Sequence, residues 1–257
     1  MSDAVLHPRR PMGRLLLAGC GVAVVAAAIV VAVQGVAGFG GWLGFRAERD
    51  GVAVMLAEVD RQIPFLADTR TDAPALYEQV VAVVARDVDL GLGPEQVVAD
   101  VTRVFETWQA EAMPDAPDRI LMAYHQLAID RMRELQRSNP SLCAALTLGK
   151  PYDDLDAHVS ERQRQREMYV NRELLRARAG ETVSRMTNAE VQSIARGIAA
   201  DLSAAIGAAA ELLHTDRQTT AEEDAIVCGY GIATMEAISA LGPDRAPAVV
   251  RGLFFPG

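Results

Sequence analysis

The segment from Leu15 to Phe45 contains no aspartate, glutamate, lysine or arginine. In its first part, Leu15 to Val33, Cys20 is the single polar side chain. A helix of about 20 apolar residues crosses the ~30 Å hydrocarbon core of a membrane. We therefore predict a transmembrane helix over residues 15–37, followed by a glycine-rich neck over residues 38–46.

The charges on the two sides of this segment predict its orientation. Residues 1–14 form a short basic leader with three arginines and one aspartate, whereas the whole chain carries a net charge of -9. Basic residues in a short flank keep that flank in the cytoplasm. The richness in alanine and arginine, with Lys150 as the single lysine, favours a bacterial source. We therefore expect a single-pass protein of the bacterial inner membrane, with its N-terminus in the cytoplasm and residues 47–257 in the periplasm.

Cys20 allows a second form of anchoring. Residues 16–20 read Leu-Leu-Ala-Gly-Cys and resemble a bacterial lipobox, whose cysteine is lipidated after the signal peptide is cut. A signal peptide has an apolar region of about 7 to 15 residues before the cut site. Here only Leu15 to Ala18 precede that site, and the long apolar run follows the cysteine. Lipidation of Cys20 is therefore the alternative to the transmembrane helix.

Apolar residues after the neck recur at intervals of three and four, and proline or glycine separates the repeating segments. This period is typical of amphipathic helices, and no alternating strand pattern is present. We predict an all-α domain of about seven helices, packed as a bundle. The expected helices are residues 47–62, the segment from Pro74 to Gly91, the segment from Pro94 to Pro114, the segment from Pro117 to Asn139, residues 154–178, the segment from Thr187 to Leu212, and the segment from Thr219 to Leu241.

Two of these helices begin with a predicted capping box, Thr187 with Glu190 and Thr219 with Glu222, in which side chain and backbone bond reciprocally. The helix after Thr187 has the clearest apolar stripe, so we expect it to be central to the core. The charged helix over 154–178 should be the most exposed.

The break at Asn139-Pro140 suggests a division of the domain into two lobes, residues 47–140 and 151–257. Cys143 lies between them in what we expect to be a short apolar turn. The tail from Ala246 to Gly257 has no predicted structure.

Cys143 and Cys228 are the two cysteines of the outer domain. In an oxidising compartment they can form a disulfide, and the alternative is two buried thiols. We predict the disulfide, which would stabilise the domain by on the order of 4 kcal/mol in the chain-entropy model.

The chain lacks the motifs of zincins, thioredoxin-like proteins, α/β-hydrolases and P-loop enzymes. His125 and Asp130 fall on different faces of one helix, so they cannot pair with each other. We therefore predict no catalytic residue, metal site or cofactor. A hydrolase that acts on the cell envelope through carboxylates stays an alternative, because a lone acid leaves no sequence pattern.

Arg162, Arg166, Arg172 and Arg176 fall within about a third of the circumference of the predicted helix over 154–178. One interpretation is a surface for an anionic partner, such as a protein or a phosphate-bearing glycan. The other is a solvated face held by salt bridges, because Glu173 lies in the same arc.

Together these features predict a membrane-anchored, periplasm-facing interaction protein without catalytic activity: a scaffold, an assembly factor or an inhibitor of the immunity type. Its partners would be the inner membrane, through residues 15–37, and a protein of the cell envelope. Small residues four apart in the span, such as Ala23 and Ala27, would also allow a homodimer. An acidic domain excludes general nucleic-acid binding, which needs a basic footprint. The alternatives are the envelope hydrolase and the lipoprotein anchored through Cys20.

Overall fold

The computed structural model describes residues 49–255, apart from positions 64, 151–154, 178–179, 206, 208–211 and 214–218. These residues form ten α-helices and two short 3₁₀ helices, and no strand occurs among them. The all-α prediction is therefore confirmed for the described part of the chain. The predicted leader, transmembrane helix and neck, with Cys20, lie outside the described residues. No helix in the described part has the length and apolar character needed to cross a membrane.

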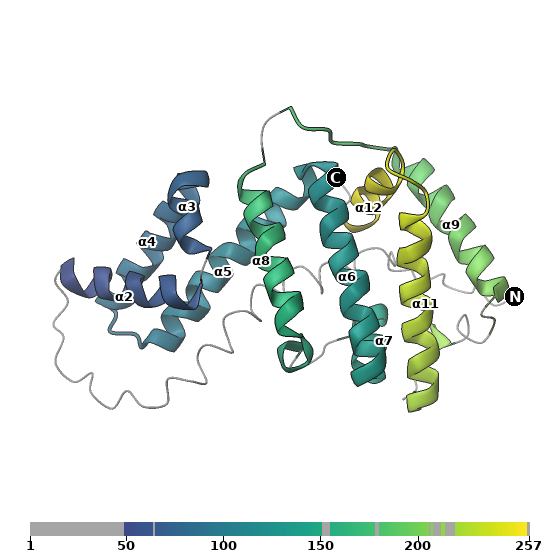
Figure 1. Ribbon diagram of the computed structural model, residues 1–257, viewed down its shortest axis with the longest axis horizontal. Coiled ribbons are helices and arrows are strands. Elements are labelled where there is room, and N and C mark those ends of the chain that lie inside the picture. The colour runs from purple at the N-terminus through teal and green to yellow at the C-terminus, as the bar shows by residue number, and fades with distance from the viewer. Residues whose placement is uncertain are drawn as a thin grey trace, which may run out of the picture.

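Four helices gather at one end of the molecule, at the left of Figure 1. They are α2 (Arg49–Gln62), α3 (Leu66–Asp72), α4 (Pro74–Asp89) and α5 (Pro94–Ala112). Phe65 and Phe105 meet edge to face in their core, with ring centroids 4.7 Å apart. Pro74 and Pro94 occupy the first turns of α4 and α5, where a missing N–H costs nothing. The sequence predicted three of these helices, and the short α3 is additional.

The other helices stand side by side around α6 (Asp118–Ser138), which carries the largest part of the second core (Figure 1). The 3₁₀ helices are η2 (Met113–Asp115) and η3 (Leu155–His158). The remaining α-helices are α7 (Pro140–Leu148), α8 (Glu161–Leu175), α9 (Asn188–Ala205), α11 (Ala221–Ser239) and α12 (Ala246–Phe254). The buried apolar face of α6 comprises Ile120, Leu121, Tyr124, Ala128, Ile129, Met132 and Leu135.

The two larger hydrophobic cores divide at the end of α5, and a small third cluster comprises Ala144, Leu212 and Val227. The first extends as far as Phe105 and also takes Leu175 from α8, and the second begins at Met113. The partly buried Trp108 packs against both. Residues 140–148, in the segment where the sequence suggested a lobe boundary, pack against the second core, because α7 contacts both α6 and α11.

The helix α7 replaces the predicted short turn around Cys143. The Asn139 side chain accepts a hydrogen bond from the Leu142 N–H at 3.1 Å, and Pro140 occupies the first turn. Gly149 ends the helix with a φ of 60°. Asn-Pro thus closes α6 and starts a new helix at once, because the two residues are favourable N-cap and N1 residues. The unassigned tail likewise contains a helix, α12.

The predicted capping box at Thr187 is confirmed: the Glu190 N–H lies 3.3 Å from the Thr187 hydroxyl, and the Thr187 N–H lies 2.9 Å from the Glu190 carboxylate. The second box was predicted one residue too early. It joins Thr220 to Glu223, while the Thr219 hydroxyl donates to the buried Asp224. Thr219 and Thr220 both fit the capping-box motif in the sequence. The Thr219 hydroxyl binds Asp224 instead, and Thr220 is the N-cap residue.

The helix α9 was expected to be central and lies at an edge. In its described part, Val191 is the single buried residue, and Ile194 and Ile198 are half-buried. It packs against α11 and α12, which cover its apolar stripe incompletely. Periodicity identifies the inward face of a helix but does not say how many neighbours cover it.

Gly231 lets α11 approach α7 and α6 closely. A Cβ at this position would lie 2.8 Å from both Thr147 Cγ2 and Met132 Cε. We expect Gly231→Ala to lower the free energy of unfolding by ~1–3 kcal/mol, because this overlap outweighs the ~1 kcal/mol that alanine gains in helix propensity. Chemical denaturation of the full chain measures the change.

The matched control is Gly197→Ala in α9, where nothing lies within 4 Å of the added Cβ. This change should stabilise the protein by about 0.5–1 kcal/mol. Stabilisation by both substitutions would show that the contact between α11 and α7 is not tight.

Candidate functional site

The helices α6 and α8 pack antiparallel, and polar side chains set their register. Arg131 donates to Glu167 at 3.1 Å, and both side chains are buried. About one turn further along α8, Asn171 accepts a hydrogen bond from Tyr124 on α6. The inward face of α8 is therefore more polar than a typical helix stripe, and this composition explains why the sequence pattern suggested an exposed helix.

The buried polar side chains between α6 and α8, called here the polar seam, are Arg131, Tyr124, Glu167 and Asn171. The seam extends to α5 and is closed to solvent. The Gln109 side chain donates to the Tyr124 hydroxyl at 2.9 Å, and burial raises the pKa of Tyr124. Gln163 is 2 % exposed, and neither polar atom of its side chain has a hydrogen-bond partner among the described residues. The seam fixes which residues of α8 face inward, and so fixes which residues face outward.

The outward faces of the same two helices form a groove of about 460 Å³. Its apolar residues are Ala123, Leu127 and Val170. Tyr169 also lines it and is 63 % exposed, one of three large hydrophobic residues in the described part with such exposure. The groove thus combines an apolar floor with an accessible aromatic ring.

The charged side chains that line the groove are Arg162 and Arg166, and Gln126 and Gln165 are its uncharged polar residues. Arg166 donates to Asp130, which also accepts from Gln126 at 3.0 Å. Arg162 is exposed and makes no ion pair with any residue in the described part of the chain. The groove therefore offers one arginine with an uncommitted charge and one whose charge is shared with Asp130.

The structure divides the four arginines that the sequence placed in one arc. Arg172 and Arg176 lie away from the groove and bind the aspartates of α3: Arg172 Nε lies 2.7 Å from Asp68 Oδ2, and Arg176 Nε lies 2.7 Å from Asp72 Oδ2. The hydrogen bond to Asp72 is the largest of the interactions that raise the pKa of Arg176. These two arginines fasten α8 to the N-terminal helices, while Arg162 and Arg166 face the groove.

His125 lies inside the protein, away from this groove. It is fully buried on α6, and its Nε2 lies 2.9 Å from the Met235 carbonyl oxygen of α11. Burial lowers its pKa and so favours the neutral ring. As predicted, His125 and Asp130 do not pair.

Cys143 and Cys228 are paired as the sequence predicted. Their sulfur atoms lie 2.02 Å apart, at disulfide distance, and the bond joins α7 to α11. Both residues are fully buried. The disulfide therefore closes the core behind α6 and takes no part in the groove.

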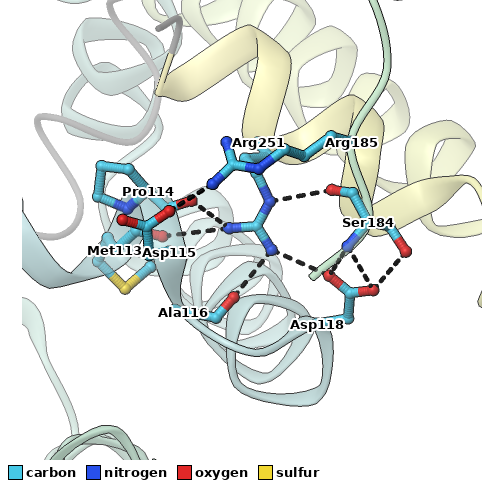
Figure 2. A network of polar contacts seen from close by, with 8 residues as sticks. All are labelled: Met113, Pro114, Asp115, Ala116, Asp118, Ser184, Arg185 and Arg251. Atoms are coloured by element: carbon cyan, nitrogen blue, oxygen red, sulfur yellow. Dashed lines mark hydrogen bonds and ion pairs between the residues drawn. The ribbon is translucent and has the colours of Figure 1, made fainter. Parts of the chain in front are cut away.

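Arg251 is the centre of a second polar arrangement, shown in Figure 2. Its guanidinium group donates to the carbonyl oxygens of Ser184 at 3.1 Å and of Ala116 at 2.8 Å, and to the Asp118 carboxylate at 2.9 Å. Two further bonds reach the carbonyls of Met113 and Pro114. An arginine has five N–H donors, so this set uses all of them. The arrangement is a joint between α12, the start of α6 and the segment before α9, with no donor left for a ligand.

Of the groove residues, Arg162 and Arg166 were identified from the sequence and the others were missed, among them the aromatic Tyr169. It lies three positions after Arg166 and seven after Arg162, a spacing that places all three on one face of a helix. The sequence shows this spacing, but it does not show that residues of α6 form the other side of the groove.

Within the described residues, no group of three or more histidine, cysteine, aspartate or glutamate side chains could hold a metal ion. The groove between α6 and α8 is the candidate site, because it combines an apolar floor with the exposed Tyr169 and Arg162. No protein-family model, curated protein or solved structure matches the chain.

Proposed function

We propose that this protein is an interaction protein of the cell envelope that binds a protein partner through the groove between α6 and α8. The observation that carries the proposal is the exposure of Tyr169 and Arg162 beside an apolar floor. Tyrosine and arginine are the residues that most often dominate binding energy at protein interfaces, where an apolar centre is surrounded by polar groups. The proposal keeps the anchor at residues 15–37 and the periplasmic location, which rest on the sequence.

The groove gives less support to the alternative of a carboxylate hydrolase. Among the described residues that line it, none is an aspartate or glutamate, and its two charged residues are arginines. Asp130, at its edge, is held by Arg166 and Gln126. A general acid needs an accessible carboxyl group beside the substrate, and the groove does not offer one.

Site-specific photo-crosslinking of the full chain in native membranes tests the proposal. A photoreactive residue at Leu127 or Tyr169 should give one defined protein adduct. The same residue at Leu90, which is 66 % exposed and lies between α4 and α5, is the control and should not give it. Arg162→Glu should reduce the adduct at Leu127 by about ten-fold if the arginine contributes roughly 1.4 kcal/mol. Equal crosslinking at Leu90 and in the groove would contradict the proposal.

A further inference from the structure

The residues on the two sides of the groove have the spacing that a further helix needs for packing against them. Its residues recur at intervals of three and four on each wall, as in Ala123, Gln126 and Leu127 on α6. Two antiparallel helices present such rows as parallel ridges, and a third helix packs its own ridge between them. The floor runs along the helices, so a helical ligand would cover it lengthwise.

The charges along α8 show what such a ligand would carry. Arg162 and Arg166 are four residues apart, which corresponds to about 6 Å along the helix axis. Two carboxylates four residues apart on a facing helix have the same separation. Tyr169 follows within one turn of Arg166, on the same face. The order along this wall is therefore the uncommitted Arg162, then Arg166, which shares its charge with Asp130, and then an aromatic ring.

We propose that the groove binds an amphipathic helix of an acidic protein partner, with carboxylates facing Arg162 and Arg166 and apolar side chains resting on Leu127, Val170 and Tyr169. This inference rests on the proposed function and names its ligand class. Charge complementarity and the apolar floor carry it together. A phosphate-bearing glycan would satisfy the arginines but would leave the floor uncovered, whereas an amphipathic helix meets both.

The test uses three synthetic peptides of about 18 residues, long enough for five helical turns. The first has leucines on one face and two glutamates four residues apart beside them. The second has lysine in place of both glutamates, and the third keeps the glutamates but has a central proline. Fluorescence anisotropy with the full chain should show saturable binding of the first peptide. The lysine and proline peptides should each bind about ten-fold more weakly.

Arg162→Glu is the principal variant, because it breaks no ion pair among the described residues and should leave the fold intact. It should lower the affinity for the glutamate peptide about ten-fold and raise the affinity for the lysine peptide. Tyr169→Ala should lower the affinity for both peptides. The matched control is Arg196→Glu on α9, which makes the same charge change at another exposed arginine and should alter neither affinity.

The possible outcomes separate this inference from the proposed function. Equal binding of the glutamate and lysine peptides, or of the helical and proline peptides, would overturn the acidic helix. No saturable binding of the glutamate peptide up to about 1 mM would also overturn it. If the crosslinks at Leu127 and Tyr169 persisted in that case, the proposed function would stand and only the ligand class would be wrong. A crosslinked adduct between two copies of this chain would show that the groove binds a second copy, and would overturn the acidic partner helix as its ligand.

Discussion

Replacing Arg251 by methionine should lower the free energy of unfolding by about 3–5 kcal/mol, the usual cost of removing one partner from a buried ion pair. The side chain is 3 % exposed. Its loss would remove the cation from the Asp118 carboxylate, which keeps its hydrogen bonds from Ser184. It would also remove the donors to the carbonyls of Ala116 and Pro114, which lie 2.8 Å and 2.5 Å from the guanidinium nitrogens. Methionine approximates the volume but supplies no donor. Urea denaturation of the full chain, followed by circular dichroism, measures the change.

Three comparisons show whether the effect is due to the contacts of Arg251. Arg245→Met, at an exposed arginine immediately before α12, should change the stability by less than about 0.5 kcal/mol. Arg251→Lys should keep the charge but lose the planar fork of donors, and so should remain clearly destabilising. A double-mutant cycle with Asp118→Asn should give a coupling energy above about 1 kcal/mol. Additive effects in that cycle would show that Arg251 and Asp118 act separately.

Removing the disulfide should destabilise the protein by about 4 kcal/mol, because the bond closes a long loop in the unfolded chain. The two cysteines are 85 positions apart in the sequence. Cys143→Ala with Cys228→Ala should lose this stabilisation and leave two small gaps in the core. Chemical denaturation with and without dithiothreitol separates the two contributions.

The wild-type protein should become less stable in dithiothreitol, and the double variant should be insensitive to it. Because both sulfur-bearing side chains are fully buried, reduction of the wild type should be slow in buffer and fast in denaturant. Quantitative thiol labelling of the denatured, unreduced protein should leave Cys143 and Cys228 unlabelled. Labelling of both cysteines would contradict the disulfide and support the alternative of two buried thiols.

The helices with strong local signals were predictable from the sequence. Pro74 and Pro94 mark the starts of α4 and α5, and Thr187 with Glu190 marks the start of α9. These signals are local: they depend on backbone groups within one turn. The disulfide was also predictable, because residues 47–257 contain only one pair of cysteines.

The candidate site was only partly predictable, because its geometry depends on residues far apart in the sequence. The pattern placed Arg162 and Arg172 on one helix face, but Asp68, which holds Arg172, lies 104 positions away. The side of the groove that α6 forms could not be predicted from the sequence either. A stripe of buried Gln163 and Asn171 reads as polar surface in a sequence, and only the opposing helix turns it into an interface.

The bond between Cys143 and Cys228 has a topological consequence. It ties α7 to α11, so α8 and α9 both lie within the closed covalent loop. One protease cut within that loop, for example in the exposed stretch before α9, leaves the two fragments attached through sulfur. After such a cut α8 stays in the N-terminal fragment, and separating this fragment from the C-terminal helices requires reduction as well as cleavage.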